Sequence, residues 1–510
     1  MLYDKTSYTR STIQRDDGSQ LMVGEVVVKP PYCFEVHAGL SESRQLKLND
    51  TAHLQLLKAI ARGISEPTVV VWDAFPQTET FAVPRLDLAN SGLVRLSKNA
   101  CITHALRSAV RRQNLAVHRG RPKVKAIQTE EDRQAGLYLE MLTAEQRLIA
   151  AGYGGDTPNF TASQVVAVGG VGFPSRHAKE RGYPVVVNAS YFLFEPEDFE
   201  SDFSVYGEPY GLHIHQGEIK LPPLFARSAL LFTRGGGAAL RQVSLRDMTI
   251  SCLGREWDLQ RFSLNAAGPY AVFNRYYGVV EGCRTRGTTE RNPGNVDFIV
   301  IGNAIVGYKV GGEAEIPHNG FVLSLPKEEL QSGEFDPVVK YRFTTGEEFG
   351  EGIQCGPGLV NDGEIVLDHT TLTKEQFFRK RHHCDGSWDA GVVPTDYAAD
   401  INRTRAARIA IGVGFSGELV ILAVEAVNRG MEEDSRESSG VTLEELARLA
   451  HASGCRCVLN MDGGGSANIQ YIFGHLIRGA DRRGLPGVIY ERMVPSVGVV
   501  RLLGMEDYSC

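Results

Sequence analysis

Near the C-terminus of the chain, apolar residues recur at the spacing of an α-helix and are followed by a short, mostly apolar run. Residues 442–445 (Thr-Leu-Glu-Glu) form a capping box, with a hydroxyl at the first position and a carboxylate three residues later. The apolar face of the segment consists of Leu443, Leu446, Ala447 and Ala450. Gly454 is a typical C-terminal stop. The pattern predicts a helix over residues 442–452 and a buried strand over residues 455–461.

The rest of the chain divides into two regions. In the second half, apolar runs bounded by Gly or polar turns predict strands over Arg227–Thr233, Val296–Gly302, Arg408–Val413 and Leu419–Val424. In the first 150 residues, the patterns predict helices over 50–61, 101–112 and 129–151, and a strand over 68–75. Gly and Pro cluster in a linker over 152–158. A chain of 510 residues exceeds one ordinary core, so we expect an accessory domain of α/β or α+β type over residues 1–150 and a second domain over residues 160–505.

The predicted strand at 455–461 leads directly into Asp462-Gly463-Gly464-Gly465-Ser466. A carboxylate therefore stands at a strand end, before three residues without side chains. Consecutive glycines cost backbone entropy and are typical of positive φ or of a close approach between the backbone and another group. A tight turn would explain the glycines alone, whereas the acid, the glycines and the hydroxyl together favour a functional site.

The segment Gly440–Ser466 (GVTLEELARLAHASGCRCVLNMDGGGS) resembles the signature of the phosphodiester glycosidase family. Six further motifs similar to that family's occur in the expected order: VNASYF at 187–192, GLHIHQGEI at 211–219, IPHNGFVLS at 316–324, GPGLV at 356–360, RIAIG at 408–412 and YERMVP at 490–495. Ser190 and Cys355 depart from the family pattern, because glycine is usual at both positions. The resemblance covers residues 160–503 and says nothing about residues 1–150.

The resemblance implies a fold class and an activity. It implies an α+β catalytic domain built around mixed sheets, with the site at the ends of the strands that carry Asn188, Arg408 and Asp462. Members of the family include the enzyme that removes N-acetylglucosamine from a sugar-1-phosphate diester. The implied substrate is thus a glycosyl-1-phosphate diester, such as an N-acetylglucosamine conjugate, a nucleotide sugar or a polysaccharide-linked phosphodiester.

Composition and charge narrow the class of partner and the compartment. The formal net charge of −7 argues against a nucleic-acid partner. No apolar run is long enough for a membrane helix, and the polar N-terminus lacks the apolar core of a signal peptide. Nine cysteines without paired spacing are most simply explained as reduced thiols, and Cys455 and Cys457 would face the same side of their strand. We therefore expect a soluble cytoplasmic hydrolase whose partner is a small-molecule or glycan phosphodiester; the sequence leaves the oligomeric state open.

Cleavage of a sugar-1-phosphate diester at C1 expels a phosphate that is stable as an anion. The site needs a cation for the phosphate and a carboxylate that activates water or stabilises positive charge at C1. Arg408 is the predicted phosphate clamp, because a planar guanidinium can bind two oxygens at once. Asp462 is the predicted carboxylate at C1, with Glu491 as the second carboxylate and Asn188 as a donor to the sugar or to Asp462. A salt-bridged arginine, a turn-capping aspartate, a surface glutamate and a turn asparagine are the corresponding structural alternatives.

Other residues of the same motifs are candidates for substrate binding. They are Gly463, Gly464, Gly465, Ser466, Arg492, His213 and His215. Two imidazoles on one face of a strand, or the His-His-Cys-Asp sequence at 382–385, could also hold a metal, but neither comes with a second ligand group at diagnostic spacing. We expect no required cofactor and leave a divalent cation at Asp462 open.

Three other functions stay open at this stage. The chain could be an ordinary exoglycosidase, a phosphodiesterase that cuts P–O instead of C–O, or a non-catalytic glycan- or nucleotide-binding protein, because a fold does not fix a function. Ser190 and Cys355 keep the last alternative open. The phosphodiesterase differs from the two glycosidases in which bond breaks, and the glycosidases differ from each other in the leaving group.

Overall fold

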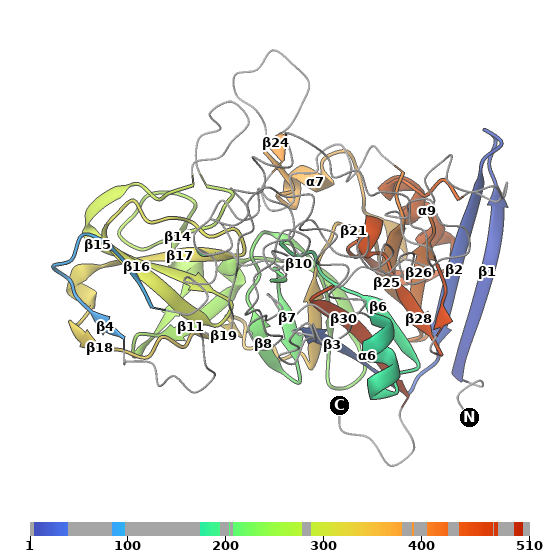
Figure 1. The fold of residues 1–510 in the computed structure, drawn as a ribbon, viewed down its shortest axis with the longest axis horizontal. Helices are drawn as coiled ribbons and strands as arrows, with labels where there is room; N and C mark the ends of the chain where they lie inside the picture. The colour runs from blue at the N-terminus through green and yellow to red at the C-terminus, as the bar shows by residue number, and fades with distance from the viewer. Residues whose placement is uncertain are drawn as a thin grey trace, which may run out of the picture.

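A computed structural model of the chain describes residues 5–38, 84–96, 174–193, 203, 208–277, 287–379, 390–391, 405–426, 438–472, 474–477 and 494–502. These residues are mostly β-sheet. Helices among them are few and short: α6 (Pro174–Arg181), α7 (Thr371–Lys374) and α9 (Leu443–Ala452), besides single 3₁₀ turns. Figure 1 shows two halves, one around β15 and β16 and the other around β25 and β26, joined by the sheets between them.

A seven-stranded antiparallel sheet forms the half that carries α9. In order across the sheet, its strands are β1 (Thr6–Gln14), β2 (Gln20–Val28), β26 (Leu419–Val424), β25 (Arg408–Gly414), β27 (Cys455–Asn460), β21 (Gly358–Asn361) and β22 (Glu364–Ile365). The apolar side of α9 packs on one face of this sheet, against Leu359, Leu422 and Val458. The helix thus covers the face from which the even-numbered residues of β25 project.

Two five-stranded sheets lie against the other face. One has the order β29 (Gly474–His475), β28 (Ile469–Tyr471), β6 (Val185–Asn188), β30 (Ser496–Leu502) and β3 (Tyr32–Ala38). The other has the order β10 (Ala238–Val243), β9 (Arg227–Phe232), β20 (Glu351–Gln354), β7 (His213–His215) and β8 (Glu218–Leu221). Ile409 and Ile411 of β25 share one core with Val187 and Leu230 of these sheets. This core fixes the strand ends of three sheets relative to one another.

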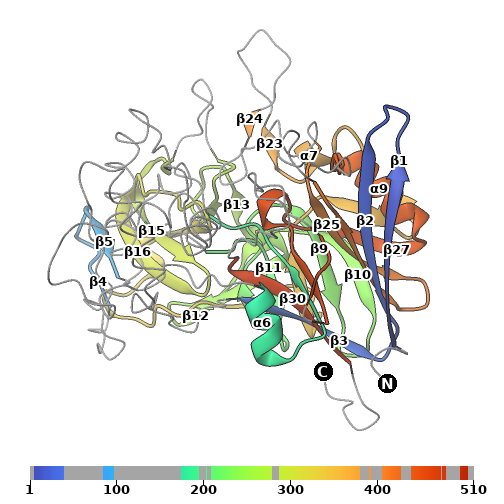
Figure 2. The same cartoon turned by 45° about the vertical axis from the view of Figure 1, so that its right-hand side comes forward.

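The other half of the molecule, around β15 and β16 in Figure 2, contains a second core that extends to β7, β8 and β9. Its six-stranded sheet has the order β13 (Ser263–Leu264), β14 (Ala271–Phe273), β17 (Gly320–Pro326), β15 (Arg291–Ile301), β16 (Ala304–Gly312) and β5 (Leu93–Arg95). A three-stranded sheet follows β12 (Arg255–Asp258), β11 (Met248–Cys252) and β19 (Lys340–Phe343). Two small pairs complete the strands, β18 (Gly333–Glu334) with β4 (Arg85–Leu86) and β23 (Phe378–Arg379) with β24 (Ala390–Gly391).

The structure confirms the elements with the clearest sequence patterns. Thr442 and Glu445 form both hydrogen bonds of the capping box, and Gly454 has a φ of 72° just beyond α9. The strands predicted around Arg227, Val296, Arg408 and Leu419 correspond to β9, the end of β15, β25 and β26. The described residues do not include the three helices and the strand predicted within 50–83 and 97–151, or the linker predicted at 152–158.

Two expectations about sheets need correction. Among the described strands only β13 and β14 pair in parallel, so the sheets are almost entirely antiparallel rather than broadly mixed. Cys455 and Cys457 do not face the same side, because a β-bulge beside Val413 and Gly414 inserts an extra residue in β27. Cys455 therefore packs in the core under α9, and Cys457 packs in the core on the opposite face.

The described strands of the first 150 residues do not form a unit of their own. Strand β2 pairs with β26, β3 with β30, and β5 with β16. These parts of the predicted accessory domain are thus hydrogen-bonded into the sheets of the region assigned to the catalytic domain. A boundary at residue 150 does not separate them, because sheet pairing joins segments that are remote in sequence.

Two observations bear on the compartment. Cys33 is disulfide-bonded, contrary to the expectation that the cysteines are all reduced, while Cys252, Cys355, Cys455 and Cys457 are free. Disulfides are typical of oxidising compartments, so the cysteine argument no longer supports a cytoplasmic location. Among the described residues, no helix has the length and apolarity needed to cross a membrane.

Candidate functional site

The strand ends that carry Asn188, Arg408 and Asp462 meet in space. Strands β25 and β27 are antiparallel, with Ala410 opposite Asn460. Continuing this register places Arg408 opposite Asp462, on the same face of the sheet. Backbone hydrogen bonds extend beyond the pairing, from the Met461 N–H to the Ile409 carbonyl over 2.9 Å. The sheet itself therefore brings the predicted cation next to the predicted carboxylate.

Asn188 holds the segment that carries Asp462. Its side-chain amide donates to the Asp462 carbonyl over 2.7 Å, and its Oδ1 accepts from the Asn468 N–H at 2.9 Å. The Asp462 N–H in turn donates to the Ala189 carbonyl at 3.1 Å. Asn188 has no exposed surface. Of the two roles predicted for Asn188, the geometry supports orientation of the Asp462 backbone.

The glycines after Asp462 allow the backbone there to lie close against the backbone at Ala407. A Cβ at Gly463 would lie 2.7 Å from the Ala407 carbonyl oxygen, so no side chain fits there. Gly464 has a φ of 58°, and its N–H donates to the same carbonyl over 2.7 Å. The Gly463 N–H donates to Oδ1 of Asp462 at 2.9 Å. Two of the three amides predicted to face a ligand are thus engaged within the protein.

Tyr191 is a member of the cluster that the sequence reasoning missed. Its hydroxyl donates to the Gly356 carbonyl over 3.0 Å and accepts from the Asn460 amide at 3.1 Å. Burial raises the pKa of Tyr191 well above its ordinary value, as do the nearby Cys355 and Asp462, while the Arg227 and Arg408 guanidinium groups act in the opposite direction. The phenol stays protonated at any physiological pH, and it lies within electrostatic reach of one carboxylate and two arginines.

Arg227 is the second missed residue. It opens β9, is 2% exposed, and places its guanidinium 3.8 Å from the ring centroid of Phe377 and 4.6 Å from that of Phe225. Stacking on aromatic rings favours a buried guanidinium. The sequence carried a signal: Arg227 and Arg408 both stand directly before apolar strands, in RSALLF and RIAIGVG.

A buried carboxyl group, Glu375, lies behind Arg227. It accepts from the Ser228 N–H at 2.9 Å, the Ser228 hydroxyl at 2.7 Å and the Gly358 N–H at 2.9 Å. Burial raises the pKa of Glu375, and these donors together with Arg227 act against that rise. We call Asn188, Tyr191, Arg227, Arg408 and Asp462 the Asp462 cluster. Glu375 supports it from behind.

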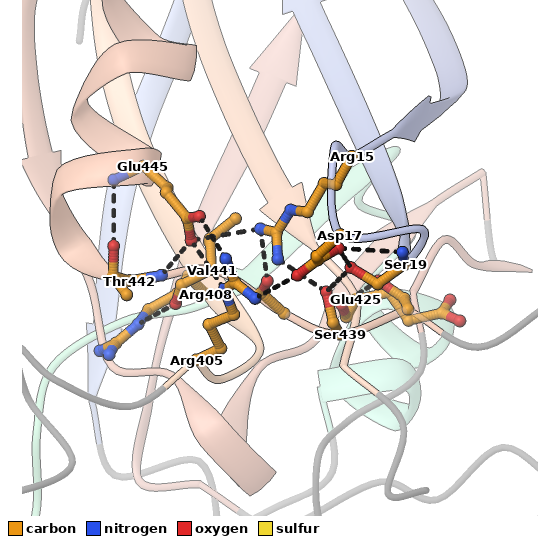
Figure 3. A network of polar contacts seen from close by, with 12 residues as sticks. Arg15, Asp17, Ser19, Arg405, Arg408, Glu425, Ser439, Val441, Thr442 and Glu445 are labelled. Carbon is orange, nitrogen blue, oxygen red and sulfur yellow. Dashed lines mark hydrogen bonds and ion pairs between the residues drawn. The ribbon is translucent and has the colours of Figure 1, made fainter.

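Arg408 is held by a network that reaches the N-terminal hairpin of β1 and β2 (Figure 3). It is 6% exposed, and its Nε donates to the Val441 carbonyl over 3.3 Å. In the same loop, Arg15 of the hairpin donates to the Gly440 carbonyl at 2.9 Å and to Glu445 at 3.2 Å. Glu445 also accepts from Arg405 at 3.0 Å, and its N-terminal position on α9 suits a carboxylate.

His213 and His215 have separate surroundings. Nε2 of His213 is 2.9 Å from the Ser190 hydroxyl, which is 2.8 Å from the Ser496 hydroxyl, and all three side chains are buried. Burial lowers the pKa of His213 to about 4. His215 instead lies 3.2 Å from the Glu351 carboxylate. Within the described parts of the chain, no three potential ligands gather as a metal site would need.

The remaining predicted residues lie outside the described residues. These are Glu491, Arg492 and the His-His-Cys-Asp segment at 382–385. Their roles stay predictions. Ser466 is buried at the end of the turn that follows Asp462.

Comparison with known proteins confirms the family read from the motifs. Residues 277–501 match the model of the phosphodiester glycosidase family. The matched residues include Arg408 and Asp462, while the motifs at 187–192 and 211–219 precede them. A search of curated proteins found no match.

Three solved structures are similar over 98% of this chain. A protein from Synechocystis is 14% identical with a TM-score of 0.44, and this chain covers 62% of its length. A protein from Burkholderia pseudomallei is 15% identical with a TM-score of 0.39, and this chain covers 96% of its length. The catalytic domain of zebrafish N-acetylglucosamine-1-phosphodiester alpha-N-acetylglucosaminidase, auto-inhibited by its pro-peptide, is 11% identical, with 83% covered and a TM-score of 0.34. With TM-scores this low, we infer nothing about the site from these structures.

Proposed function

We propose that the chain is a hydrolase that cleaves the sugar C1–O bond of a glycosyl-1-phosphate diester. One observation carries the proposal: the half-buried carboxylate of Asp462, which lies in the region similar to the phosphodiester glycosidase family, shares a cluster with two buried arginines. A carboxylate and a cation side by side match the two charges that develop when C1 loses a phosphate. The substrate class follows from that pairing and from the family.

In the proposed reaction the C1–O bond breaks and its electron pair leaves with the phosphate. The leaving phosphate monoester is already an anion, so its oxygen needs no proton from the protein at that moment. Arg408 binds the phosphate, and Arg227 adds positive charge from behind. Asp462 either attacks C1 or removes a proton from the attacking water; the separation between the carboxylates decides between these courses. Asn188 holds the Asp462 backbone through its carbonyl, and the Gly463 amide donates to the Asp462 carboxylate.

Tyr191 has a positioning role in this proposal. Its phenol bridges the Asn460 amide and the Gly356 carbonyl, and so ties β27 to the segment that enters β21. Because its pKa lies well above the ordinary value, the phenol does not add a second negative charge beside Asp462. The reaction requires no cofactor in our proposal, and turnover in EDTA tests whether a divalent cation at Asp462 contributes.

The experiment that tests the proposal is a hydrolysis assay in ¹⁸O-enriched water over a panel of sugar-1-phosphate diesters and nucleotide sugars. C1–O cleavage places the label on the sugar, whereas P–O cleavage places it on the phosphate. Label on the phosphate would make the chain a phosphodiesterase. Turnover of neutral aryl glycosides alone would make it an ordinary glycosidase, and ligand binding without turnover of any substrate would favour the non-catalytic alternative.

A further inference from the structure

An open cavity of about 510 Å³ lies beside the three-stranded sheet β12–β11–β19. In Figure 1 this sheet belongs to the half of the molecule that contains β15 and β16, away from β25. Small-molecule sites usually measure about 300–1,000 Å³, so this cavity is large enough for a ligand. We call it the β11 cavity. Its lining consists of Thr249, Glu256, Trp257, Asp258, Arg261, Phe262, Tyr270, Arg342 and Thr344.

The floor of the β11 cavity is built from cross-strand neighbours. Thr249 on β11 lies opposite Asp258 on β12 and opposite Arg342 on β19. This row presents a carboxylate, a hydroxyl and a guanidinium side by side on one face of the sheet. Thr249 is 5% exposed, and its hydroxyl lies 3.3 Å from that of Thr344. The buried hydroxyl of Thr249 and the half-buried hydroxyl of Thr344 thus form the base, where each can both donate and accept.

The charges around this floor balance. Arg342 lies 2.9 Å from the Glu256 carboxylate, and Nε of Arg261 lies 3.2 Å from the Asp258 carboxylate. Two acids and two arginines leave no net charge within the lining. A strongly charged ligand would gain little binding energy from such a site, because each arginine or carboxylate that attracts it has a neighbour of opposite charge that repels it. A ligand that both donates and accepts hydrogen bonds can use every group.

An aromatic wall completes the cavity. The half-buried Tyr270 ring packs 5.5 Å from Phe262 and 6.4 Å from Trp257, measured between ring centroids. The Tyr270 hydroxyl donates to Glu329 over 2.9 Å, which fixes the ring. Phe262 and Trp257 are almost completely buried and support it from below. A rigid aromatic side chain contributes contact area at low cost in conformational entropy.

We propose that the β11 cavity is a binding site for a neutral saccharide. Vicinal hydroxyls match the row of carboxylate, hydroxyl and guanidinium groups, and the C–H face of a pyranose ring packs against Tyr270. The site is independent of the proposed hydrolysis at Asp462. Its role would be to hold a glycan portion of a larger molecule while another part of that molecule occupies a different site.

The test uses isothermal titration calorimetry on the full chain with neutral tetrasaccharides of glucose, mannose and N-acetylglucosamine, and with heparin as a charged contrast. The variants are Arg342→Gln, which removes the charge from a side chain that is 54% exposed, and Thr344→Val, which removes a hydroxyl without changing the shape. Arg246→Gln, an exposed arginine outside the lining, is the matched control. Thermal melts verify that each variant folds.

We expect at least one neutral tetrasaccharide to bind, and Arg342→Gln to weaken its binding by about tenfold or more, since a hydrogen bond to a charged group is lost. Thr344→Val should weaken it several-fold, and Arg246→Gln should leave it unchanged. Four results would overturn the proposal: no neutral tetrasaccharide binds, only heparin binds, Arg342→Gln and Thr344→Val both bind like the parent, or Asp462→Asn rather than Arg342→Gln abolishes binding.

Discussion

The Asp462 cluster and the β11 cavity gather the same kinds of side chain in opposite physical settings. In the cluster, Arg227 and Arg408 are 2% and 6% exposed, and backbone groups from three sheets fix their surroundings. In the cavity, the side chains of Arg342 and Arg261 are 54% and 86% exposed, and they pair with neighbours on the same small sheet. Burial strengthens electrostatic interactions, so the cluster is suited to stabilise charge in a reaction.

The same difference predicts what substitution does in each region. Solvent screens the exposed pairs of the cavity, which contribute little to stability and are free to exchange their partner for a ligand. The buried groups of the cluster cannot be removed without leaving a charge or a polar atom uncompensated. Changes in the cluster should therefore be large and specific to catalysis, and changes in the cavity should be small and specific to binding.

The largest effect is expected from Asp462→Asn, which keeps the shape and removes the anion. Turnover of a sugar-1-phosphate diester should fall by at least about two orders of magnitude, because the group that activates water or stabilises C1 is lost. Steady-state kinetics measure it. Asp362→Asn makes the same chemical change at an exposed turn and should leave turnover intact. Full activity in folded Asp462→Asn protein would remove Asp462 from the proposed reaction.

The next largest effect separates a phosphate clamp from a structural arginine. Arg408→Lys keeps the charge and loses the planar fork. Activity on the sugar-1-phosphate diester should fall by about tenfold or more relative to activity on a neutral activated glycoside, since only the diester has a phosphate to bind. The ratio of the two kcat/KM values is the measurement.

Arg227→Lys serves as the comparison within the cluster, because Arg227 stacks between aromatic rings. If Arg227 supports the cluster without binding the phosphate, its replacement should lower the activities on the diester and on the neutral glycoside together. The ratio of the two kcat/KM values should then stay nearer to that of the parent. Equal losses on both substrates in Arg408→Lys would assign Arg408 a structural role.

The third prediction concerns how the stability of the fold around the Asp462 cluster depends on pH. Burial lowers the pKa of His213 to about 4, from about 6.5 in an unfolded chain. The unfolded state therefore binds a proton at a higher pH than the folded state. The contribution of His213 to the free energy of unfolding is fully present above pH 6.5. It falls by about 3 kcal/mol as the pH drops from 6.5 to 4.

Burial and the nearby His37 also lower the pKa of His177 to about 4, so both histidines act in the same direction. Urea unfolding at several pH values measures the loss. His213→Gln should flatten the curve between pH 6.5 and 4 whatever its effect at neutral pH. An equally steep curve in that variant would assign the acid sensitivity to other groups.

The smallest effect tests whether the N-terminal hairpin supports Arg408 from a distance. Arg15→Ala removes hydrogen bonds to Ser439, Gly440 and Glu445 next to the loop that Arg408 contacts. We expect a loss of about 1 kcal/mol in stability and a few-fold fall in kcat with KM nearly constant. Arg15→Lys should recover part of the rate. A change in stability without any change in kcat would make the network purely structural.

The sequence was most informative for elements whose structure depends on residues close by in the chain. The capping box of α9, the strand that leads to Asp462 and the turn of three glycines depend on neighbours within a few residues. The family motifs likewise marked Arg408, Asp462 and Asn188, which the structure brings together. Tyr191 and Arg227 were within or close to these motifs and were still missed, because their importance lies in burial beside remote residues.

The sequence by itself determined the helix, the principal strands and the similarity of residues 277–501 to the phosphodiester glycosidase family. Tertiary structure alone decided that β2, β3 and β5 pair with strands hundreds of residues away, that a bulge turns Cys455 and Cys457 to opposite faces, and that the row of Asp258, Thr249 and Arg342 forms a cavity floor. The physical reason is that a helix satisfies its hydrogen bonds within itself, whereas a strand satisfies them with a partner that local sequence does not specify.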